Sequence, residues 1–444
     1  MINRFYLRVF FIALGVVCLI ASKLFASSFD MYGASSRAAA TSDLGTIDRA
    51  DSSFIYTNPA FLTAVRAFSV ELGWFRASDF FEPIQGIVTQ NSLSGKSTSV
   101  GNVQTNYPDL SGVTFGFLIP GRMSLPKISF GLKGFLPVGS LASIRTLEQY
   151  VPVYNQYHQR TKRFSFVASA AMEPIEHFSV GIAANLYLKS GANTKINLNE
   201  SNSSVSMAMD IVPAISPIVG LKYQWNALGI DAAYHEPLDY AMMLNNKTEM
   251  PLFRANNADA SIPIVEFLAQ TSMFYDPRIV RLGISYLIAN RYLVGVEGLW
   301  KNWKKYQLPI NQVTFINPGE IQSKLPLVEF KDVISPGVGL EFPVGSVTLR
   351  GGYRFEPNHI QNQETNSNVV DTNVHVFSSG LGYRLKSLFG FFQEGVDVNA
   401  HLQYHYLESK QVVKSDMNTV GYKKDGYRVG GSLLNYGLSL QVTF

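Results

Sequence analysis

The sequence lacks the features that mark helical membrane proteins and disulfide-linked proteins. It contains a single cysteine, Cys18, and only 16% of its 444 residues are charged. No apolar stretch reaches the roughly 20 residues that a membrane-spanning helix requires. One cysteine can form neither an internal disulfide nor a thiolate zinc site. These absences exclude a helical membrane protein and a disulfide framework.

Residues 1–26 are expected to form a secretory signal peptide. Arg4 and Arg8 give it a positive start, and residues 9–21 form an almost unbroken apolar run. Small residues follow, as a signal peptidase requires. The residue before Cys18 is a valine, whereas a lipoprotein signal needs a small residue there. We therefore expect no lipid anchor and a mature chain without cysteine.

Charge and motif content argue against nucleic-acid binding and catalysis. Loss of Arg4, Arg8 and Lys23 with the signal peptide lowers the net charge from +4 to +1, whereas nucleic-acid binding usually shows as a basic patch. Residues 95–97 resemble the end of a phosphate-binding loop, but Gln90 stands in place of its first glycine. We expect no nucleic-acid partner, no cofactor and no enzyme activity.

No metal site is expected either. His401 and His405 share one face of a predicted strand, where a rise of about 3.3 Å per residue places them roughly 13 Å apart. That separation is too large for one metal ion without other ligands. We expect both histidines to be solvated in the interior of the protein.

Apolar and polar residues alternate in many short segments from residue 67 onward. In residues 396–406 every even-numbered residue is apolar, and every odd-numbered residue from Asp397 to His405 is polar. Successive side chains of a strand point to opposite sides, so each such segment has one apolar and one polar face. This period of two indicates β-strands rather than helices.

The arrangement of these segments predicts a closed barrel in an outer membrane. Long connections alternate with short ones, as the long outer loops and short periplasmic turns of such barrels do. We predict an all-β fold, a 14-stranded antiparallel transmembrane β-barrel over residues 67–444, in the outer membrane of a Gram-negative bacterium. The alternative is a large soluble all-β protein. The predicted strands are 67–75, 111–119, 127–137, 164–173, 178–190, 214–225, 228–237, 279–289, 291–302, 332–342, 345–355, 374–385, 394–408 and 430–444.

Residues 27–66 do not alternate and are rich in small and turn-forming residues, which predicts a compact hatch, or plug, inside the barrel. The residues that stand out are Gly33, Arg37, Asn58, Pro59 and Ala60. In order and approximate spacing they resemble the N-terminal hatch of the FadL-type family. That family comprises outer-membrane transporters of long-chain fatty acids and other hydrophobic compounds, and it includes the TodX-like transporters of aromatic hydrocarbons. Glycines often follow the Arg-Ala pair in the family, but residues 39–42 contain none.

The resemblance also implies an interruption of the third strand that opens the barrel wall sideways. Pro137 and Gly139 stand at the end of the predicted third strand. Proline lacks an N–H for the ladder and glycine weakens a strand interior, so both suit a break in pairing. The alternative is that the strand simply ends there.

Strand parity places several charged side chains toward the lumen. Among them Arg350, Arg354 and Arg281 are candidates for binding a ligand carboxylate, because arginine offers a planar bidentate donor. The alternative is that the lumenal cations pair with lumenal acids and brace the wall. Those acids are Glu71, Asp231, Glu297, Glu341 and Asp397.

The connection 238–278 is unusually apolar for an extracellular loop. By the family resemblance it would form an outer groove that captures a hydrophobic ligand, and packing onto neighbouring loops is the alternative. The residues concerned include Ile264, Phe267, Leu268, Met273 and Phe274.

The last predicted strand ends at Phe444 with apolar residues on one face. This ending resembles the signal by which barrel-assembly machinery recognises its substrates.

The resemblance implies passive, ligand-gated uptake of long-chain fatty acids or other hydrophobic molecules. The ligand would be captured at the loops, pass to a lumenal pocket and leave through the side opening after the hatch shifts. We expect a monomer surrounded by outer-membrane lipids. The alternatives are a general diffusion porin, an outer-membrane lipid-modifying enzyme and a structural or adhesion barrel.

Overall fold

The computed structural model describes most of the chain after the expected signal peptide, which itself lies outside the described residues. The described residues are 28–44, 51–90, 97–103, 105, 107–121, 127–142, 152–154, 156–157, 161–197, 204–251, 261–308, 312–317, 321–322, 328–361, 369–385, 395–413 and 426–444.

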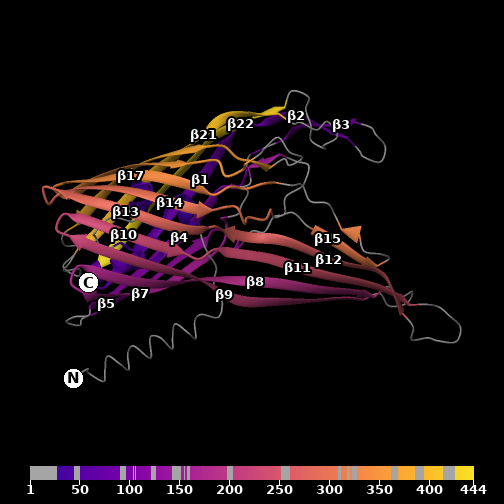
Figure 1. The fold of residues 1–444 in the computed structure, drawn as a ribbon, viewed down its shortest axis with the longest axis horizontal. Coiled ribbons are helices and arrows are strands. Elements are labelled where there is room, and N and C mark those ends of the chain that lie inside the picture. Colours follow the sequence, from indigo (N-terminus) through magenta and orange to yellow (C-terminus); the bar gives the residue numbers. More distant parts are fainter. Residues whose placement is uncertain are drawn as a thin grey trace, which may run out of the picture.

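Fourteen antiparallel strands form a closed barrel, which confirms the predicted fold (Figure 1). Each strand pairs with the next in the ring, and the last returns to the first through a ladder that begins at Ser69↔Thr443. A closed cylinder leaves no unpaired strand edge facing hydrocarbon. In order around the ring the strands are β1 (Ser69–Phe81), β4 (Leu110–Pro120), β5 (Lys127–Pro137), β7 (Ser165–Ile175), β8 (Phe178–Asn197), β9 (Ser204–Trp225), β10 (Leu228–His235), β13 (Arg278–Ile288), β14 (Tyr292–Asn302), β17 (Val333–Val344), β18 (Val347–Glu356), β20 (Val374–Leu385), β21 (Val396–Val412) and β22 (Tyr427–Thr443).

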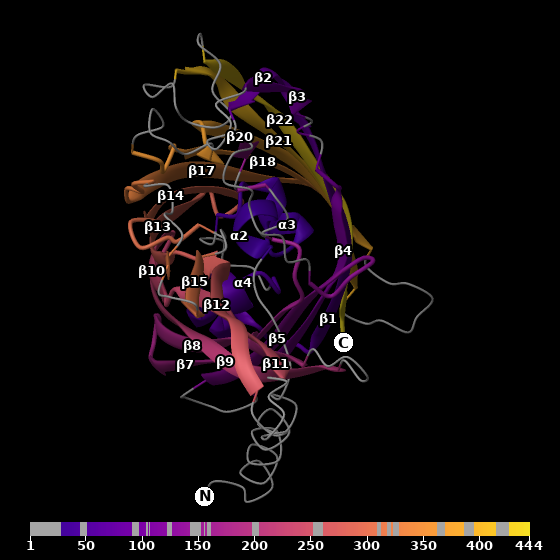
Figure 2. The same cartoon turned by 90° about the vertical axis from the view of Figure 1, so that its right-hand side faces the viewer.

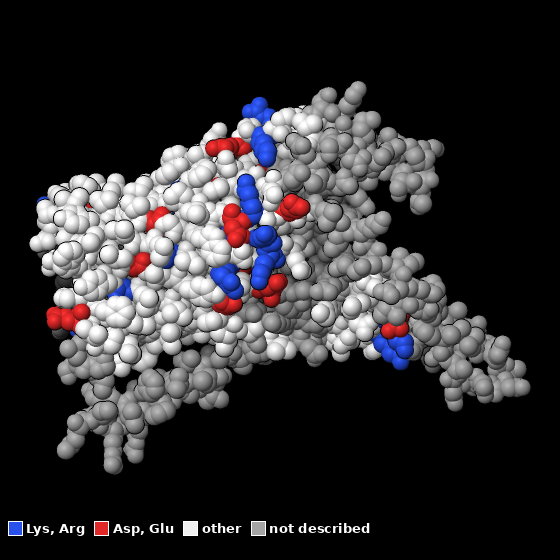
Figure 3. Space-filling view, viewed as in Figure 1, with Lys and Arg blue, Asp and Glu red and all other residues white. Residues whose placement is uncertain are grey.

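The wall alternates as the sequence predicts. In β22, Leu438 and Leu440 are 56% and 43% exposed on the outside, whereas Ser439 and Gln441 are buried inside. Figure 3 shows few charged side chains over most of the barrel surface and a band of them toward one end. The outer surface of the barrel therefore suits contact with lipid.

The two ends of the barrel differ. Short turns join β7 to β8, β9 to β10, β13 to β14 and β17 to β18 at one end, which makes that end periplasmic. The other end, which is extracellular, carries additional strands. They are β2 (Ile84–Gln90), β3 (Ser97–Val103), β6 (Val153–Tyr154), β11 (Leu238–Pro251), β12 (Ser261–Asp276), β15 (Gln312–Asn317), β16 (Ile321–Gln322) and β19 (Val369–Val370).

The structure adds strands in the long connections, which the list of predicted strands left out. Residues 238–276 form the hairpin β11–β12, and β11 pairs in parallel with β8 from Leu244↔Ala192 to Glu249↔Asn197. β8 and β9 also remain paired well past the predicted end of β8. The parallel pairing of β11 with β8 joins strands that are not consecutive in the chain, and a pattern within one segment does not reveal such a partner.

Four short helical elements of residues 28–66 lie inside the ring of strands (Figure 2). They are α2 (Phe29–Tyr32), α3 (Ser36–Ala40), α4 (Phe54–Thr57) and the 3-10 helix η1 (Pro59–Ala64). Nearly all of their residues are buried. These elements thus occupy the lumen, and residues 28–66 are called the hatch below. Within the described part of the chain, no helix has the length and apolar character needed to cross a membrane.

Two wall glycines allow η1 to approach the barrel closely. A Cβ atom at Gly220 would lie within 3.0 Å of Asn58 Oδ1, and one at Gly181 would lie within 3.0 Å of the backbone of Pro59 and Ala60. Neither wall position has room for a side chain while η1 keeps its place.

We predict that Gly181→Ala and Gly220→Ala displace η1 and raise the ion conductance of the barrel in planar lipid bilayers. The added methyl group meets hatch atoms at both positions, so something must shift. Gly298→Ala is the matched control, because a Cβ atom there has no neighbour within 4 Å. Equal conductance of all three variants would contradict the prediction.

Candidate ligand-binding site

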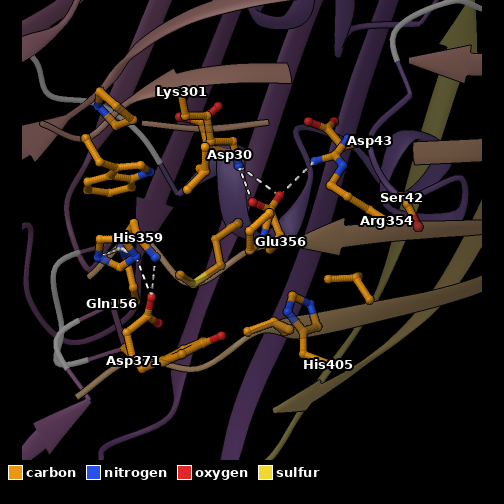
Figure 4. Close-up of a pocket in the computed structure, with 18 of the residues that line it drawn as sticks. Asp30, Ser42, Asp43, Gln156, Lys301, Arg354, Glu356, His359, Asp371 and His405 are labelled. Carbon is orange, nitrogen blue, oxygen red and sulfur yellow. Dashed lines mark hydrogen bonds and ion pairs between the residues drawn. The ribbon is translucent and has the colours of Figure 1, made fainter. Parts of the chain in front are cut away.

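A cavity lies between the hatch and the extracellular end of the barrel (Figure 4). Its volume is about 90 Å³, several times the ~10–15 Å³ that one water molecule needs. The hatch provides Asp30, Met31, Ser42 and Asp43, and the barrel strands and the segments beyond them provide the rest. The hatch is therefore part of the wall of this cavity.

The apolar part of the lining is built on an aromatic cluster. Trp303 lines the cavity and packs against Tyr306 and Tyr275, with ring centroids 5.5 and 5.9 Å away. Phe330 and Val333 belong to the same buried cluster. This side of the cavity offers a hydrophobic surface to a ligand.

The polar part of the lining is an ion-pair network. Lys301 Nζ donates to both Glu356 oxygens at 2.8 and 2.7 Å, and the Ser335 hydroxyl donates to Glu356 at 2.7 Å. The Arg354 guanidinium lies 4.0 Å from Glu356 and 3.5 Å from Glu297. Both cations of the cavity are thus already next to carboxylates.

A histidine–aspartate pair completes the extracellular side. His359 Nδ1 lies 2.6 Å from Asp371 Oδ2, and the Gln156 amide lies 2.8 Å from Nε2 of the same ring. The ring packs on Trp303, with centroids 4.6 Å apart, and on Phe330. Sequence reasoning missed all three polar residues, because they lie in connections and carry no motif.

Asp43 links the hatch to this network. Its backbone oxygen accepts a hydrogen bond of 2.9 Å from Arg281, and its carboxylate lies 3.5 Å from the same guanidinium. Burial raises the pKa of the Asp43 carboxyl to about 6, and the neighbouring Arg281 and Arg354 only partly oppose that shift.

The three candidate arginines have different surroundings. Arg281 donates to Glu297 at 2.9 Å, and Arg350 donates to Glu341 at 2.7 Å, so both pair with lumenal acids. Of the three, only Arg354 lines the cavity. The geometry of Arg281 and Arg350 fits the bracing role that the sequence left open.

The hatch residues singled out in the sequence are anchored to different parts of the wall. Arg37 forms a bidentate ion pair with Glu341, at 2.7 and 2.9 Å. Asn58 Nδ2 donates toward the Leu221 carbonyl at 3.2 Å and the Asp231 carboxylate at 3.3 Å.

Other motif residues shape the hatch itself. Asn58 Oδ1 caps η1 by accepting from the Ala60 N–H at 3.1 Å, and Pro59 opens that helix. Gly33 has φ +87°, and a Cβ atom there would meet Ala39. The structure therefore gives each of these residues a conformational or anchoring contact.

The third barrel strand, β5, ends at Pro137, and its pairing with β7 is interrupted just before that end. Pairing of β5 with β7 stops at Phe135↔Ser165 and resumes at Ala142↔Arg163, so that residues 136–141 lie opposite Phe164 alone. On the other side β5 stays paired to β4 as far as Gly112↔Pro137. Gly139, at φ +89°, lies within the interruption.

The predicted capture residues all lie in β12. Phe274 is buried against Leu238, beneath the Arg163 guanidinium at 5.1 Å. Phe267 and Leu268 are half-buried and pair with β11 and β15. The side chains of Ile264 and Met273 lie outside the described residues.

The expectation that His401 and His405 are solvated was wrong, because the hatch covers the polar face of β21. The two side chains are 7% and 3% exposed, and the ring of Tyr32 lies 6.4 Å from that of His405. Gln403, between them, donates to the Ala39 carbonyl of the hatch at 2.9 Å. In the described part of the chain no three His, Cys, Asp or Glu residues gather as metal ligands.

The closed barrel has the same fold as several solved structures, three of which are described here. For a Pseudomonas aeruginosa FadL homologue the TM-score is 0.57 at 14% identity, over 95% of this chain and 99% of that chain. For the P. putida toluene transporter TodX the TM-score is 0.52 at 14% identity, over 94% of this chain and 99% of that chain. For the Ralstonia pickettii toluene transporter TbuX the TM-score is 0.52 at 15% identity, over 94% of this chain and 100% of that chain.

The family follows from the sequence itself. Residues 152–444 match the model of the outer membrane protein transport protein family (OMPP1/FadL/TodX). The chain belongs to this family and is an outer-membrane protein. A comparison with curated proteins found no match.

We predict that Glu341→Gln loosens the hatch more than Arg37→Met does. Glu341 sits between Arg37 and Arg350, so its neutralisation leaves two buried cations without their shared partner, at a cost of about 3–5 kcal/mol. Arg37→Met leaves Glu341 paired with Arg350.

Hatch loosening can be measured by maleimide labelling, because Cys18 is the only native cysteine and lies in the expected signal peptide. The reporter is Ala38→Cys, at a buried hatch position. We expect at least tenfold faster labelling in Glu341→Gln than in the otherwise unaltered reporter, with Arg37→Met in between. Equal rates in all three would contradict the anchoring role.

Proposed function

We propose that this protein takes up a hydrophobic compound across the outer membrane by passive, ligand-gated diffusion. The observation that carries the proposal is a cavity with an aromatic side, bounded below by a buried hatch inside a closed barrel. The ligand enters from the extracellular end, binds in the cavity and leaves when the hatch shifts. Family membership supports a transport role, and two proteins of the same fold, TodX and TbuX, are toluene transporters.

The packing of the lumen argues against a general diffusion porin. A porin needs a continuous aqueous channel. Here Phe29, Ile55 and Leu62 of the hatch are fully buried in a core that includes the wall residues Phe135 and Val167. Ions do not pass through such a core while the hatch keeps its place.

The His359–Asp371 pair is the feature that an outer-membrane enzyme would share. A hydrolytic site also needs a nucleophile activated by the histidine. The second ring nitrogen of His359 instead faces the Gln156 amide. The pair therefore supports a structural role in the cavity wall better than a catalytic one.

We predict that a reversible link between hatch and wall switches uptake off. The hydroxyls of Ser42 and Ser378 lie 2.8 Å apart, so Ser42→Cys with Ser378→Cys places two thiols within disulfide reach. Liposomes that contain the oxidised double variant should take up labelled toluene at least tenfold more slowly than the same liposomes after reduction.

The control for this experiment is a link within the wall. The hydroxyls of Ser69 and Thr443 lie 3.1 Å apart on paired strands β1 and β22, and neither residue belongs to the hatch. Oxidation of Ser69→Cys with Thr443→Cys should leave uptake unchanged. Undiminished uptake by the oxidised Ser42→Cys/Ser378→Cys variant would contradict the hatch gate.

We further propose that the ligand leaves sideways through the interruption of the third strand. Leu136, Val138 and Leu141 are between 42% and 59% exposed there, which gives an exit an apolar rim on the lipid side. The buried Phe135 joins the start of the interruption to the hatch residue Phe29, with ring centroids 6.4 Å apart. A movement of the hatch would thus displace Phe135 at the start of the opening.

A deletion of residues 137–141 tests the side exit. It would place Ala142 directly after Leu136 and opposite Arg163, so the ladder between β5 and β7 would continue without a break. We expect uptake into liposomes to fall at least tenfold while labelling of the Ala38→Cys reporter stays unchanged. Normal uptake through this sealed wall would exclude the side exit.

The outer surface and the last strand of the barrel support proposals about its oligomeric state, its lipids and its assembly. We propose that the barrel works as a monomer, with its apolar outer residues in contact with outer-membrane lipids. The alternation of the last strand up to Phe444, whose ring packs 5.6 Å from that of Phe68, supports recognition by barrel-assembly machinery.

A further inference from the structure

Four buried side chains of the cavity each have a polar atom without a hydrogen-bond partner among the described residues. The side chains are no more than 4% exposed. Figure 4 shows three of them, Asp43, Arg354 and His405, around the cavity. The atoms are Asp43 Oδ1, Arg354 Nε, Thr372 Oγ1 and His405 Nε2.

A pure hydrocarbon is a poor match for this lining. It would cover the aromatic side well, but it would displace water from the polar side and offer no hydrogen bond in return. Acceptors such as Asp43 Oδ1 and donors such as Arg354 Nε would then stay unsatisfied in a dry site. A cavity selected for hydrocarbons would be expected to be apolar throughout.

A carboxylate is also a poor match, because the lining is acidic on balance. The two cations, Lys301 and Arg354, are already next to Glu356, and Arg354 is also next to Glu297. A negative head group would meet these occupied cations and repulsion from four carboxyl groups. The acids of the lining are Asp30, Asp43, Glu356 and Asp371.

We propose that the ligand is a hydrophobic molecule with a neutral hydroxyl group, an alcohol or a phenol. This inference rests on the proposed uptake function and names its substrate class. A hydroxyl group both donates and accepts, so it can donate to Asp43 Oδ1 and accept from Arg354 Nε. The Arg354 charge acts on Asp43, and Figure 4 shows the two groups on the same side of the cavity. The apolar body of the ligand then lies toward Trp303 and Val333.

The test compares three ligands that share a ring and a methyl group, namely toluene, p-cresol and p-toluate. Their binding is measured by titration calorimetry on the barrel in lipid nanodiscs, with empty nanodiscs subtracted to remove partitioning into lipid. We expect the Kd of p-cresol to be about tenfold lower than that of toluene. Its ratio to the Kd of p-toluate should be smaller still. A Kd of toluene or p-toluate equal to or below that of p-cresol would overturn the proposal.

Two variants localise the preference. Arg354→Lys keeps the positive charge beside Glu297 and Glu356 but removes the Nε–H donor, and Thr372→Val removes a hydroxyl with little change of shape. Both should reduce the advantage of p-cresol over toluene at least threefold, while toluene binding is retained. Thr443→Val, at the periplasmic end of the wall, is the matched control and should keep the full preference. An unchanged preference in both cavity variants would overturn the assignment of these residues.

The same ligands separate this inference from the proposed function. If liposomes that contain the barrel take up toluene and p-cresol equally well, uptake stands and the hydroxyl preference is wrong. If none of the three ligands binds or enters, the uptake function itself is wrong. Preferential uptake of p-cresol supports both.

Discussion

Closure of the β-barrel is the constraint on which the rest of this structure depends. A strand edge cannot remain unpaired in hydrocarbon, so the sheet must close, and a ring of fourteen strands encloses a lumen too wide for its own side chains to fill. The hatch fills that lumen. Because its backbone lies against the wall, positions such as Gly181 and Gly220 have no room for a side chain. The shape of the hatch and the composition of the inner wall are thus consequences of the same closure.

Charged pairs anchor the hatch in a way that suits the movement proposed for it. Glu341 receives Arg37 from the hatch and Arg350 from the wall, and Asp43 meets Arg281. The net contribution of a buried ion pair is small when both partners regain water on separation, because their hydration offsets the lost attraction. When an apolar contact of similar size is separated, hydration of the exposed surface does not offset the lost contact. Water entering with a ligand therefore lowers the free-energy cost of releasing a hatch held by charges.

The sequence predicted the wall well and the cavity poorly, for a physical reason. A period of two and a regular alternation of short and long connections follow from local geometry, so the strand count and the inner and outer faces could be predicted. The hatch prediction instead came from the small, turn-forming residues of 27–66 and from the family resemblance. Parity also placed Arg281, Arg350 and Arg354 inside, but only the register Glu341↔Arg350 and contacts with the hatch show which of them are paired. The contacts of His359 with Asp371 and Gln156 bring together residues from separate connections of the chain. A pattern within one segment does not predict such contacts.

The position of the cavity would couple ligand binding to the proposed movement of the hatch. Asp43 and Ser42 belong to the hatch and line the cavity, and Ser42 also contacts the wall at Ser378. A ligand that hydrogen-bonds to Asp43 therefore binds with different affinity to different positions of the hatch. Such a difference is the only means by which a ligand can shift a conformational equilibrium. In the proposed gate, selectivity and opening are therefore linked, because a molecule that fits the cavity without touching Asp43 would shift the hatch less than one that hydrogen-bonds to it.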